Sequence, residues 1–202
     1  MPSDRLPPLP EAAGRPKAAV GRKVVMALFG FALVAGFVQP IAALPQEETS
    51  KLEYEVKAVF LYHFTRYLQW PKADAPGGFE IAVLGESAIV APLTEIAAKK
   101  TVNQRPILIR MIDSMEALGR PHVLFVAKTA TPRLRRILEE TRGKAILTVG
   151  EEDGLGDEGL AVNFVLRDGA VKFEINERVL RASGIQPSSQ LLKLAIPAGG
   201  GK

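Results

Sequence analysis

The chain has 202 residues, with 26 Lys and Arg against 22 Asp and Glu, two His and no Cys. This length fits one domain of ordinary size or two small ones. A composition of 47% hydrophobic and 24% charged residues is that of a globular protein rather than a disordered one. The lack of cysteine excludes disulfides, thiolate nucleophiles and cysteine-ligated zinc or iron–sulfur centres. Because His63 and His122 are the only histidines, a multi-histidine metal site is excluded as well.

The first 43 residues have the pattern of a signal peptide. A polar, proline-rich stretch ends in Arg22-Lys23, and an uncharged apolar run follows over residues 24–38. As a helix this run would span about 22 Å, less than the roughly 30 Å of a bilayer core. Export with cleavage after Ala43 is therefore favoured over an uncleaved membrane anchor. Removing residues 1–43 takes away five basic and two acidic residues and lowers the net charge from +4 to +1, so the basic character of the chain does not indicate nucleic-acid binding.

The rest of the chain is predicted to form a short linker (44–51), a single domain (52–195) and a flexible tail (196–202). A helix over residues 48–69 is expected to come first, and it is stopped at Trp70-Pro71 because a proline disfavours helix at the residue before it. Apolar residues recur along this helix in two stripes: Leu52, Val56, Val59, Phe60, Phe64 and Tyr67 in one, and Tyr54, Ala58, Leu61 and Leu68 in the other. A helix that is apolar on two sides is expected to lie between two layers or at a contact with another protein.

Beyond this helix, strand and helix patterns alternate along the chain. Strands are predicted at 79–84, 106–112, 122–127 and 145–149, helices at 89–99 and 131–141, and a helical turn at 114–118. Thr131 is expected to be the N-cap of the second helix, with Pro132 at its first position. This alternation is typical of an α/β domain with a mainly parallel sheet and right-handed crossovers.

The last third of the chain is predicted to add an antiparallel hairpin. Strand-like runs at 160–166 and 171–175 are joined through Asp168-Gly169, a dipeptide that favours tight hairpin turns. Short helices are expected at 177–183 and 188–195. The predicted fold class is therefore a single α/β domain, whose mainly parallel sheet is flanked by helices and ends in a C-terminal antiparallel hairpin.

Motifs that suggest catalysis or cofactor binding lack the context that such sites need. Residues 154–159 match the G-x-G-x-x-G dinucleotide fingerprint, but the next predicted element is a strand, and nearby carboxylates would repel a phosphate. A flexible acidic loop is favoured there. Ser87 does not lie in a G-x-S-x-G elbow, and the carboxylates of residues 151–158 fit no EF-hand spacing and favour a solvated loop. We therefore expect no catalytic residues, no cofactor and no metal.

One predicted feature could form a small-ligand pocket. If the strands ending near residues 84, 127 and 149 are parallel, the turns that follow them border a crevice of the kind where open α/β sheets bind ligands. Gly85, Ser87, Lys128 and Thr129 lie in these turns, and backbone N–H groups together with the lysine would suit a small anion. The alternative is that these are ordinary turns at strand ends.

Several segments, taken together, resemble the YfiR-like family. The clearest is residues 57–64 (KAVFLYHF), followed by Tyr67 and Trp70-Pro71. The other matching segments occur in the order of the family over residues 52–195: 79–85, 122–126, 147–150, 162–165, 171–176 (VKFEIN) and 191–195 (LLKLA). The resemblance implies an exported α/β protein of the Gram-negative periplasm, often a homodimer, without catalytic residues.

The resemblance also implies a role in signalling. The best-known member of the family represses an inner-membrane diguanylate cyclase by binding its periplasmic sensor domain. An outer-membrane lipoprotein sequesters this repressor, which raises cyclic-di-GMP and biofilm formation. Many members have cysteine pairs whose disulfides matter to stability, and this chain has no cysteine.

The sequence therefore predicts a periplasmic regulatory protein that acts by contact with a membrane sensor. Tyr62, Arg66, Tyr67 and Trp70 are the candidate partner-binding residues, because aromatic residues dominate the energetics of interfaces. The alternative for these side chains is that they belong to the core. The alternative function is a periplasmic receptor for a small ligand at the strand-end crevice, and an unrecognised hydrolase is a third possibility.

Overall fold

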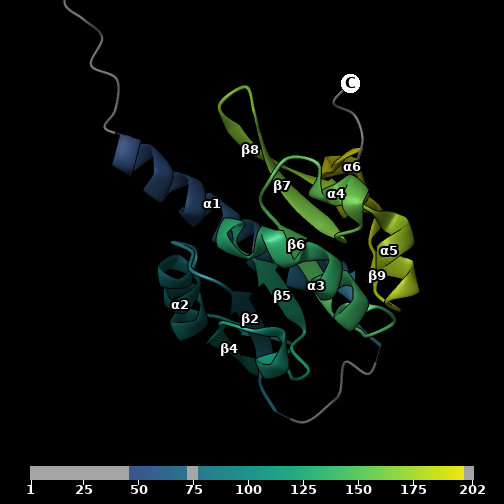
Figure 1. The fold of residues 1–202 in the computed structure, drawn as a ribbon. Helices are drawn as coiled ribbons and strands as arrows, with labels where there is room; N and C mark the ends of the chain where they lie inside the picture. Colours follow the sequence, from purple (N-terminus) through teal and green to yellow (C-terminus); the bar gives the residue numbers. More distant parts are fainter. Residues whose placement is uncertain (1–45, 72–76, 198–202) are drawn as a thin grey trace, which may run out of the picture. The chain divides into compact units, whose positions relative to one another are not determined.

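The computed structural model describes residues 46–71 and 77–197. The predicted signal peptide, residues 1–43, lies outside the described residues, as does most of the predicted tail. The described residues form one layered α/β unit, with helices on both faces of a twisted sheet (Figure 1).

The main sheet has eight strands in the order β10-β8-β7-β6-β5-β2-β4-β3. Their bounds are β2 Phe79–Leu84, β3 Thr101–Val102, β4 Arg105–Ile112, β5 Val123–Val126, β6 Leu147–Gly150, β7 Val162–Arg167, β8 Ala170–Ile175 and β10 Ile196–Pro197. Strands β4, β2, β5, β6 and β7 are parallel, whereas β8 runs antiparallel to β7 and β3 antiparallel to β4. The predicted fold class is thus confirmed, including the C-terminal hairpin.

The hairpin of β7 and β8 turns where the sequence predicted. Asp168 and Gly169 both have positive φ, 54° and 71°, and Arg167 is paired with Ala170 across the turn. Positive φ at both central positions gives a turn whose twist matches that of the flanking strands, and Asp-Gly adopts this conformation at low cost. The local dipeptide therefore fixes the register of the whole hairpin.

The helices divide between the two faces of the sheet. Helices α1 (Gln46–Tyr67), α2 (Val90–Lys99), α5 (Glu177–Ala182) and α6 (Ser189–Leu194) cover one face, and α3 (Leu134–Thr141) and the 3₁₀ helix η1 (Met115–Ala117) cover the other. Strand β2 shows this division most simply. Its Ile81 and Val83 pack in the core on the α1 face of the sheet, and its Ala82 and Leu84 pack in the core on the α3 face. Both faces are buried, as expected for parallel strands with crossover helices.

Helix α1 buries one of its two apolar stripes and leaves part of the other in solvent. Ala58 and Leu61 are completely buried against the sheet, whereas Leu52 and Val59 are 59% and 47% exposed. The helix begins at Gln46, two residues before the start predicted at residue 48. It ends at Tyr67, and the short strand β1 (Leu68–Gln69) then pairs with β9 (Gln186–Pro187).

Two local predictions about connecting segments are wrong. A 3₁₀ helix, η2 (Lys128–Arg133), precedes α3, so Thr131 lies inside a helical turn and does not cap α3. The segment predicted as a flexible acidic loop contains the short helix α4 (Leu155–Glu158), whose Leu155 is buried against Leu134 and Leu160. In α4 the burial of Leu155 outweighs the local polar pattern.

Candidate binding sites at the two edges of the sheet

The parallel strands give the sheet two distinct edges. We use "carboxyl edge" for the side where β2, β5 and β6 end, and "amino edge" for the side where β2 and β5 begin. Helix α1 spans from one to the other, because Lys57 reaches Glu151 just after β6 and Arg66 lines a cavity together with His122 just before β5. A single helix therefore contributes side chains to both edges.

At the carboxyl edge, Lys57 and Glu151 form a buried ion pair. The Nζ of Lys57 lies 2.8 Å from Oε2 of Glu151, and the two side chains are 3% and 1% exposed. Glu53, one turn earlier on α1, approaches the same Nζ to 2.5 Å. The backbone N–H of Lys128 and the hydroxyl of Tyr54 donate to Oε1 of Glu151 at 3.4 and 3.5 Å. The sequence predicted Glu151 to lie in a solvated loop, and that prediction is wrong.

The ion pair keeps the nearby groups in their ordinary protonation states. Burial lowers the pKa of Lys57, but its hydrogen bonds to Glu151 and Glu53 outweigh burial, so the pKa is raised above its usual value. Burial, followed by the charge of Glu151, raises the pKa of Tyr54. At neutral pH the lysine is therefore charged, and the tyrosine keeps the proton that it donates.

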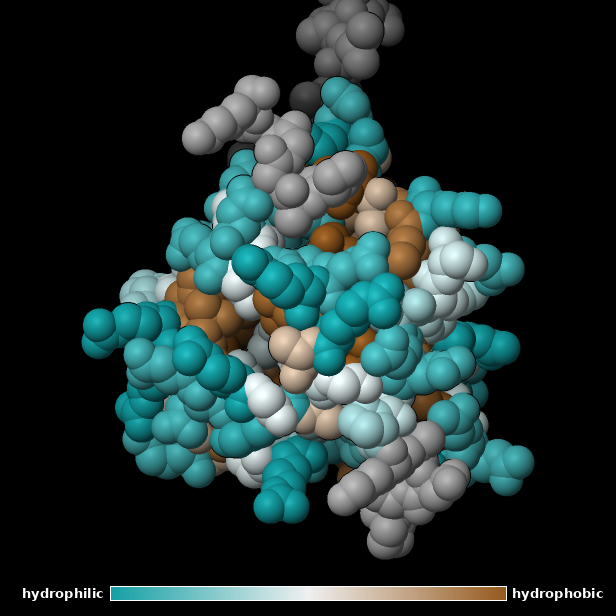
Figure 2. Space-filling model, turned by 90° about the vertical axis from the view of Figure 1, so that its right-hand side faces the viewer, coloured by the Kyte–Doolittle hydropathy of each residue, from teal (hydrophilic) through white to brown (hydrophobic). Residues whose placement is uncertain are grey.

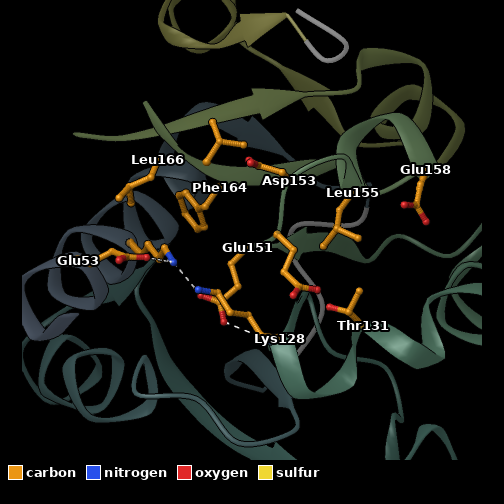
Figure 3. Close-up of a pocket in the computed structure, with 12 residues that line it drawn as sticks. Glu53, Lys128, Thr131, Glu151, Asp153, Leu155, Glu158, Phe164 and Leu166 are labelled. Atoms are coloured by element: carbon orange, nitrogen blue, oxygen red, sulfur yellow. Dashed lines mark hydrogen bonds and ion pairs between the residues drawn. The ribbon is translucent and has the colours of Figure 1, made fainter. Parts of the chain in front are cut away.

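A cavity of about 520 Å³ opens beside this ion pair. Figure 3 shows Glu53, Glu151 and Lys128 gathered on one side of it, with Phe164 and Leu166 of the β7 strand lying opposite. The carboxylates of Glu152, Asp153 and Glu158 complete much of the lining. In addition, the buried Oγ1 of Thr131 has no hydrogen-bond partner. Carboxylates thus outnumber cations around this cavity.

Of the four candidate ligand residues, Lys128 alone lines the cavity. The hydroxyl of Thr129 accepts a hydrogen bond from the N–H of Glu86, and the N–H of Gly85 donates to the carbonyl of Ile112. A Cβ on Gly85 would lie 2.5 Å from Oγ1 of Thr129, so these two turns are in close contact. Ser87 accepts from the N–H of Ile89 at the start of α2. The other three residues therefore hold the turns together.

At the amino edge, three rings form a compact group. The indole Nε1–H of Trp70 donates to the carbonyl of His122 at 3.2 Å, and its ring meets the edge of Phe79 at 5.2 Å. The imidazole of His122 stacks on Phe79 at 4.4 Å, and its Nδ1 accepts the N–H of Glu80. Burial, followed by the charge of Arg105, lowers the pKa of His122. The imidazole is therefore neutral, with its proton on Nε2.

Two cavities of about 480 Å³ each lie on either side of Trp70 and His122, which line both. One also contains Arg66 and Arg105, and the other contains Arg120 and Lys144. Among the described residues, neither lining includes a carboxylate. The two edges of the sheet therefore differ in the sign of their charge.

The candidate partner-binding residues occupy different environments. Arg66 is exposed, whereas Tyr62, Tyr67 and Trp70 are half-buried. The three aromatic rings pack against the core on the α1 side. His63 on the same helix is exposed. Sequence analysis missed Lys57, although its place between two apolar stripes and one turn after Glu53 could have indicated a buried pair.

The described residues form an α/β domain with cavities at both ends of its parallel strands. Within the described ranges, no three His, Cys, Asp or Glu side chains are grouped so that they could hold a metal ion. The YfiR/HmsC-like family model matches residues 54–196, and the chain therefore belongs to the YfiR/HmsC-like family. None of the curated proteins matches the sequence significantly.

Membership of this family associates the protein with regulation in the periplasm and with control of a diguanylate cyclase. Within residues 46–71 and 77–197, no helix has the length and apolar character needed to span a bilayer.

Proposed function

We propose that the protein is an exported periplasmic regulator that represses an inner-membrane diguanylate cyclase by binding its periplasmic domain. The family match supports the regulatory role. The observation that carries the proposal of contact is the exposed apolar stripe of α1. In this proposal an outer-membrane lipoprotein competes for the protein, and a homodimer is the active form.

The surface proposed for the contact is the outer face of α1, defined by Leu52, Val56, Val59 and Phe60 with Glu55 and His63 at its border. These residues line a shallow, mostly apolar hollow. Leu52 and Val59 are each about half exposed, so a partner that covers them gains the hydrophobic contribution of that area. On the side of the molecule drawn in Figure 2, by comparison, hydrophobic residues appear as separate patches between hydrophilic side chains.

The candidate residues Tyr62, Arg66, Tyr67 and Trp70 continue this surface toward the end of α1. Arg66 is exposed and offers a cation, while the half-buried aromatic rings offer their edges. A partner lying along α1 would therefore meet an apolar first half and a more polar, aromatic second half.

Repression by contact requires that the protein distinguish two states of the sensor. Binding shifts the sensor only by the difference between its affinities for the active and the inactive arrangement. A tenfold preference for the inactive arrangement corresponds to about 1.4 kcal/mol. Removal of the repressor by the lipoprotein would reverse the shift and raise cyclic-di-GMP.

The test is capture of the membrane partner in cells by crosslinking to the wild-type chain and to Leu52→Gln/Val59→Gln. We expect the double variant to lose most of the captured diguanylate cyclase and to raise cyclic-di-GMP, while circular dichroism shows an unchanged fold. Met111→Gln is the matched control, since Met111 is 68% exposed on β4 and outside α1. Equal capture by all three proteins would contradict the proposed surface.

The alternative function, a receptor for a small ligand, is supported by the cavity at the carboxyl edge and by the unpartnered Oγ1 of Thr131. The carboxylates around Lys128 favour an amine-bearing ligand over the small anion suggested by the sequence. Thermal-shift measurements with small amines and small anions test it, because a specific ligand stabilises the folded state. If no probe raises the melting temperature, this alternative is excluded for those probes.

A further inference from the structure

The two cavities of the amino edge each contain an exposed arginine. Arg66 lines one and Arg120 lines the other, and neither forms an ion pair with a described residue. Two surface arginines elsewhere, Arg136 and Arg167, pair with the carboxylates of Glu116 and Asp153. The amino edge thus presents cationic groups whose charge is not satisfied by neighbouring described side chains.

One further basic residue lines each of these cavities. Arg105 in one cavity donates to the carbonyls of Gly77 and Gly78, and Lys144 in the other lies 3.8 Å from Glu140. No described residue that lines either cavity has a carboxylate. An anion placed in either cavity would therefore meet arginine without a competing negative charge from the described lining.

Trp70 and His122 line both cavities, and we call these two side chains the Trp70–His122 partition. Both are held in place before any ligand arrives. Trp70 is fixed by its hydrogen bond to the carbonyl of His122 and by its edge contact with Phe79. His122 is fixed by its stacking on Phe79 and by the N–H of Glu80. A preformed site loses little conformational entropy on binding, so weak individual contacts add up to a measurable affinity.

We propose that the amino edge binds an extended, acidic segment of the partner protein, with carboxylates in both cavities and the chain crossing the Trp70–His122 partition. Guanidinium groups bind carboxylates in a planar, two-bond geometry, which suits Arg66 and Arg120. An extended segment fits better than a single small anion because the two arginines lie in different cavities. This inference rests on the proposed function, since it names the chemistry that the partner would offer.

Trp70 provides the measurement, because it is the only tryptophan of the chain and lines both cavities. Its fluorescence is titrated with a capped hexaglutamate peptide, with capped hexaglutamine and with free glutamate. We expect hexaglutamate to change the emission and to bind about tenfold more weakly after Arg66→Gln or Arg120→Gln, the change expected for one lost charge-assisted pair. Binding should also weaken as salt rises.

Arg135→Gln is the matched control, because Arg135 is 94% exposed on α3 and lines neither cavity. It should bind hexaglutamate as the wild type does. If the double variant Arg66→Gln/Arg120→Gln binds hexaglutamate as tightly as Arg135→Gln, the inference is overturned. If free glutamate binds as tightly as the peptide, the site takes a small anion and the extended segment is wrong.

Capture in cells separates this inference from the proposed function. Loss of the diguanylate cyclase with the double arginine variant, but not with Arg135→Gln, supports the amino edge as its docking site. If the double variant still captures the cyclase while Leu52→Gln/Val59→Gln does not, the amino-edge inference fails and the proposed function stands. If the wild type captures no cyclase, the proposed function fails, and the peptide titration still decides whether the edge binds acidic segments.

Discussion

At the carboxyl edge Lys57 and Glu151 are almost completely buried and lie 2.8 Å apart, whereas at the amino edge Arg66 and Arg120 are exposed and unpaired among the described residues. Buried charges are tolerated only when they are paired and hydrogen-bonded, so the first arrangement is a requirement of folding. Exposed charges contribute little to stability. Arg66 and Arg120 could therefore pair with a partner's carboxylates without losing an ion pair to a described residue, and this difference is the reason for proposing the amino edge as the docking site.

Among the variants that test this comparison, Lys57→Met is expected to have the largest effect on stability. The substitution leaves Glu151 buried without its cation, and the free energy of unfolding is expected to fall by about 3–5 kcal/mol. Chemical denaturation followed by circular dichroism measures the loss. Lys51→Met is the control, because the side chain of Lys51 is 79% exposed on the same helix, and its removal is expected to change stability little.

The double variant Lys57→Met/Glu151→Gln tests whether the instability of Lys57→Met comes from the unpaired charge of Glu151. Because it removes both charges, it should recover most of the stability lost in Lys57→Met. If the double variant is as unstable as the single one, the loss comes from packing around Lys57, and the ion pair does not hold the carboxyl edge together.

Most of the fold could be predicted from local patterns, and the clearest case is the hairpin. Asp168 and Gly169 determine their turn through their own backbone preferences, so the neighbouring residues suffice to predict it. The strand at 79–84 is likewise predicted to the residue, because a short apolar run with a clear start and end leaves little choice. Predictions of this kind need no knowledge of distant contacts.

The candidate sites could be predicted only in part, because they depend on residues far apart in the chain. Lys57 and Glu151 are 94 positions apart. The acidic pattern around Glu151 indicates a solvent-exposed loop, and only the contact with the distant Lys57 reveals that this carboxylate is buried. Both stripes of α1 are apolar, so the sequence could not decide which would face the sheet. Lys128 lines the cavity at the carboxyl edge, and its role in ligand binding stays a prediction. The pairing of Thr129 with the turn at Glu86 emerged only from the fold.

A smaller effect is expected at the amino edge from Trp70→Phe. Phenylalanine keeps a ring beside Phe79 but removes the Nε1–H that donates to the carbonyl of His122, so stability should fall by about 1 kcal/mol. Denaturation by urea measures the change. Tyr62→Phe serves as the comparison, since Tyr62 is also half-buried on the same segment and its hydroxyl has no partner among the described residues. An equal loss in both variants would mean that the Trp70 hydrogen bond does not stabilise the partition.

The smallest expected effect is the pH dependence that His122 gives to the amino edge. Its pKa is lowered by burial and by the charge of Arg105, and the opposing influence of Glu80 does not restore it. As pH falls below about 6.5, the unfolded chain takes up a proton before the folded protein does, so the free energy of unfolding decreases until the folded pKa is reached.

His122→Asn tests this pH dependence, because its amide oxygen can replace Nδ1 as acceptor for the N–H of Glu80 but cannot titrate. Between pH 7.5 and pH 5, the stability of the variant should fall less steeply than that of the wild type. His63→Asn is the control, since His63 is exposed on α1 and lines neither cavity of the amino edge. If His122→Asn keeps the full slope and His63→Asn loses it, the amino edge does not depend on a neutral imidazole, and the rigid partition between its two cavities has to be explained by Trp70 and Phe79 alone.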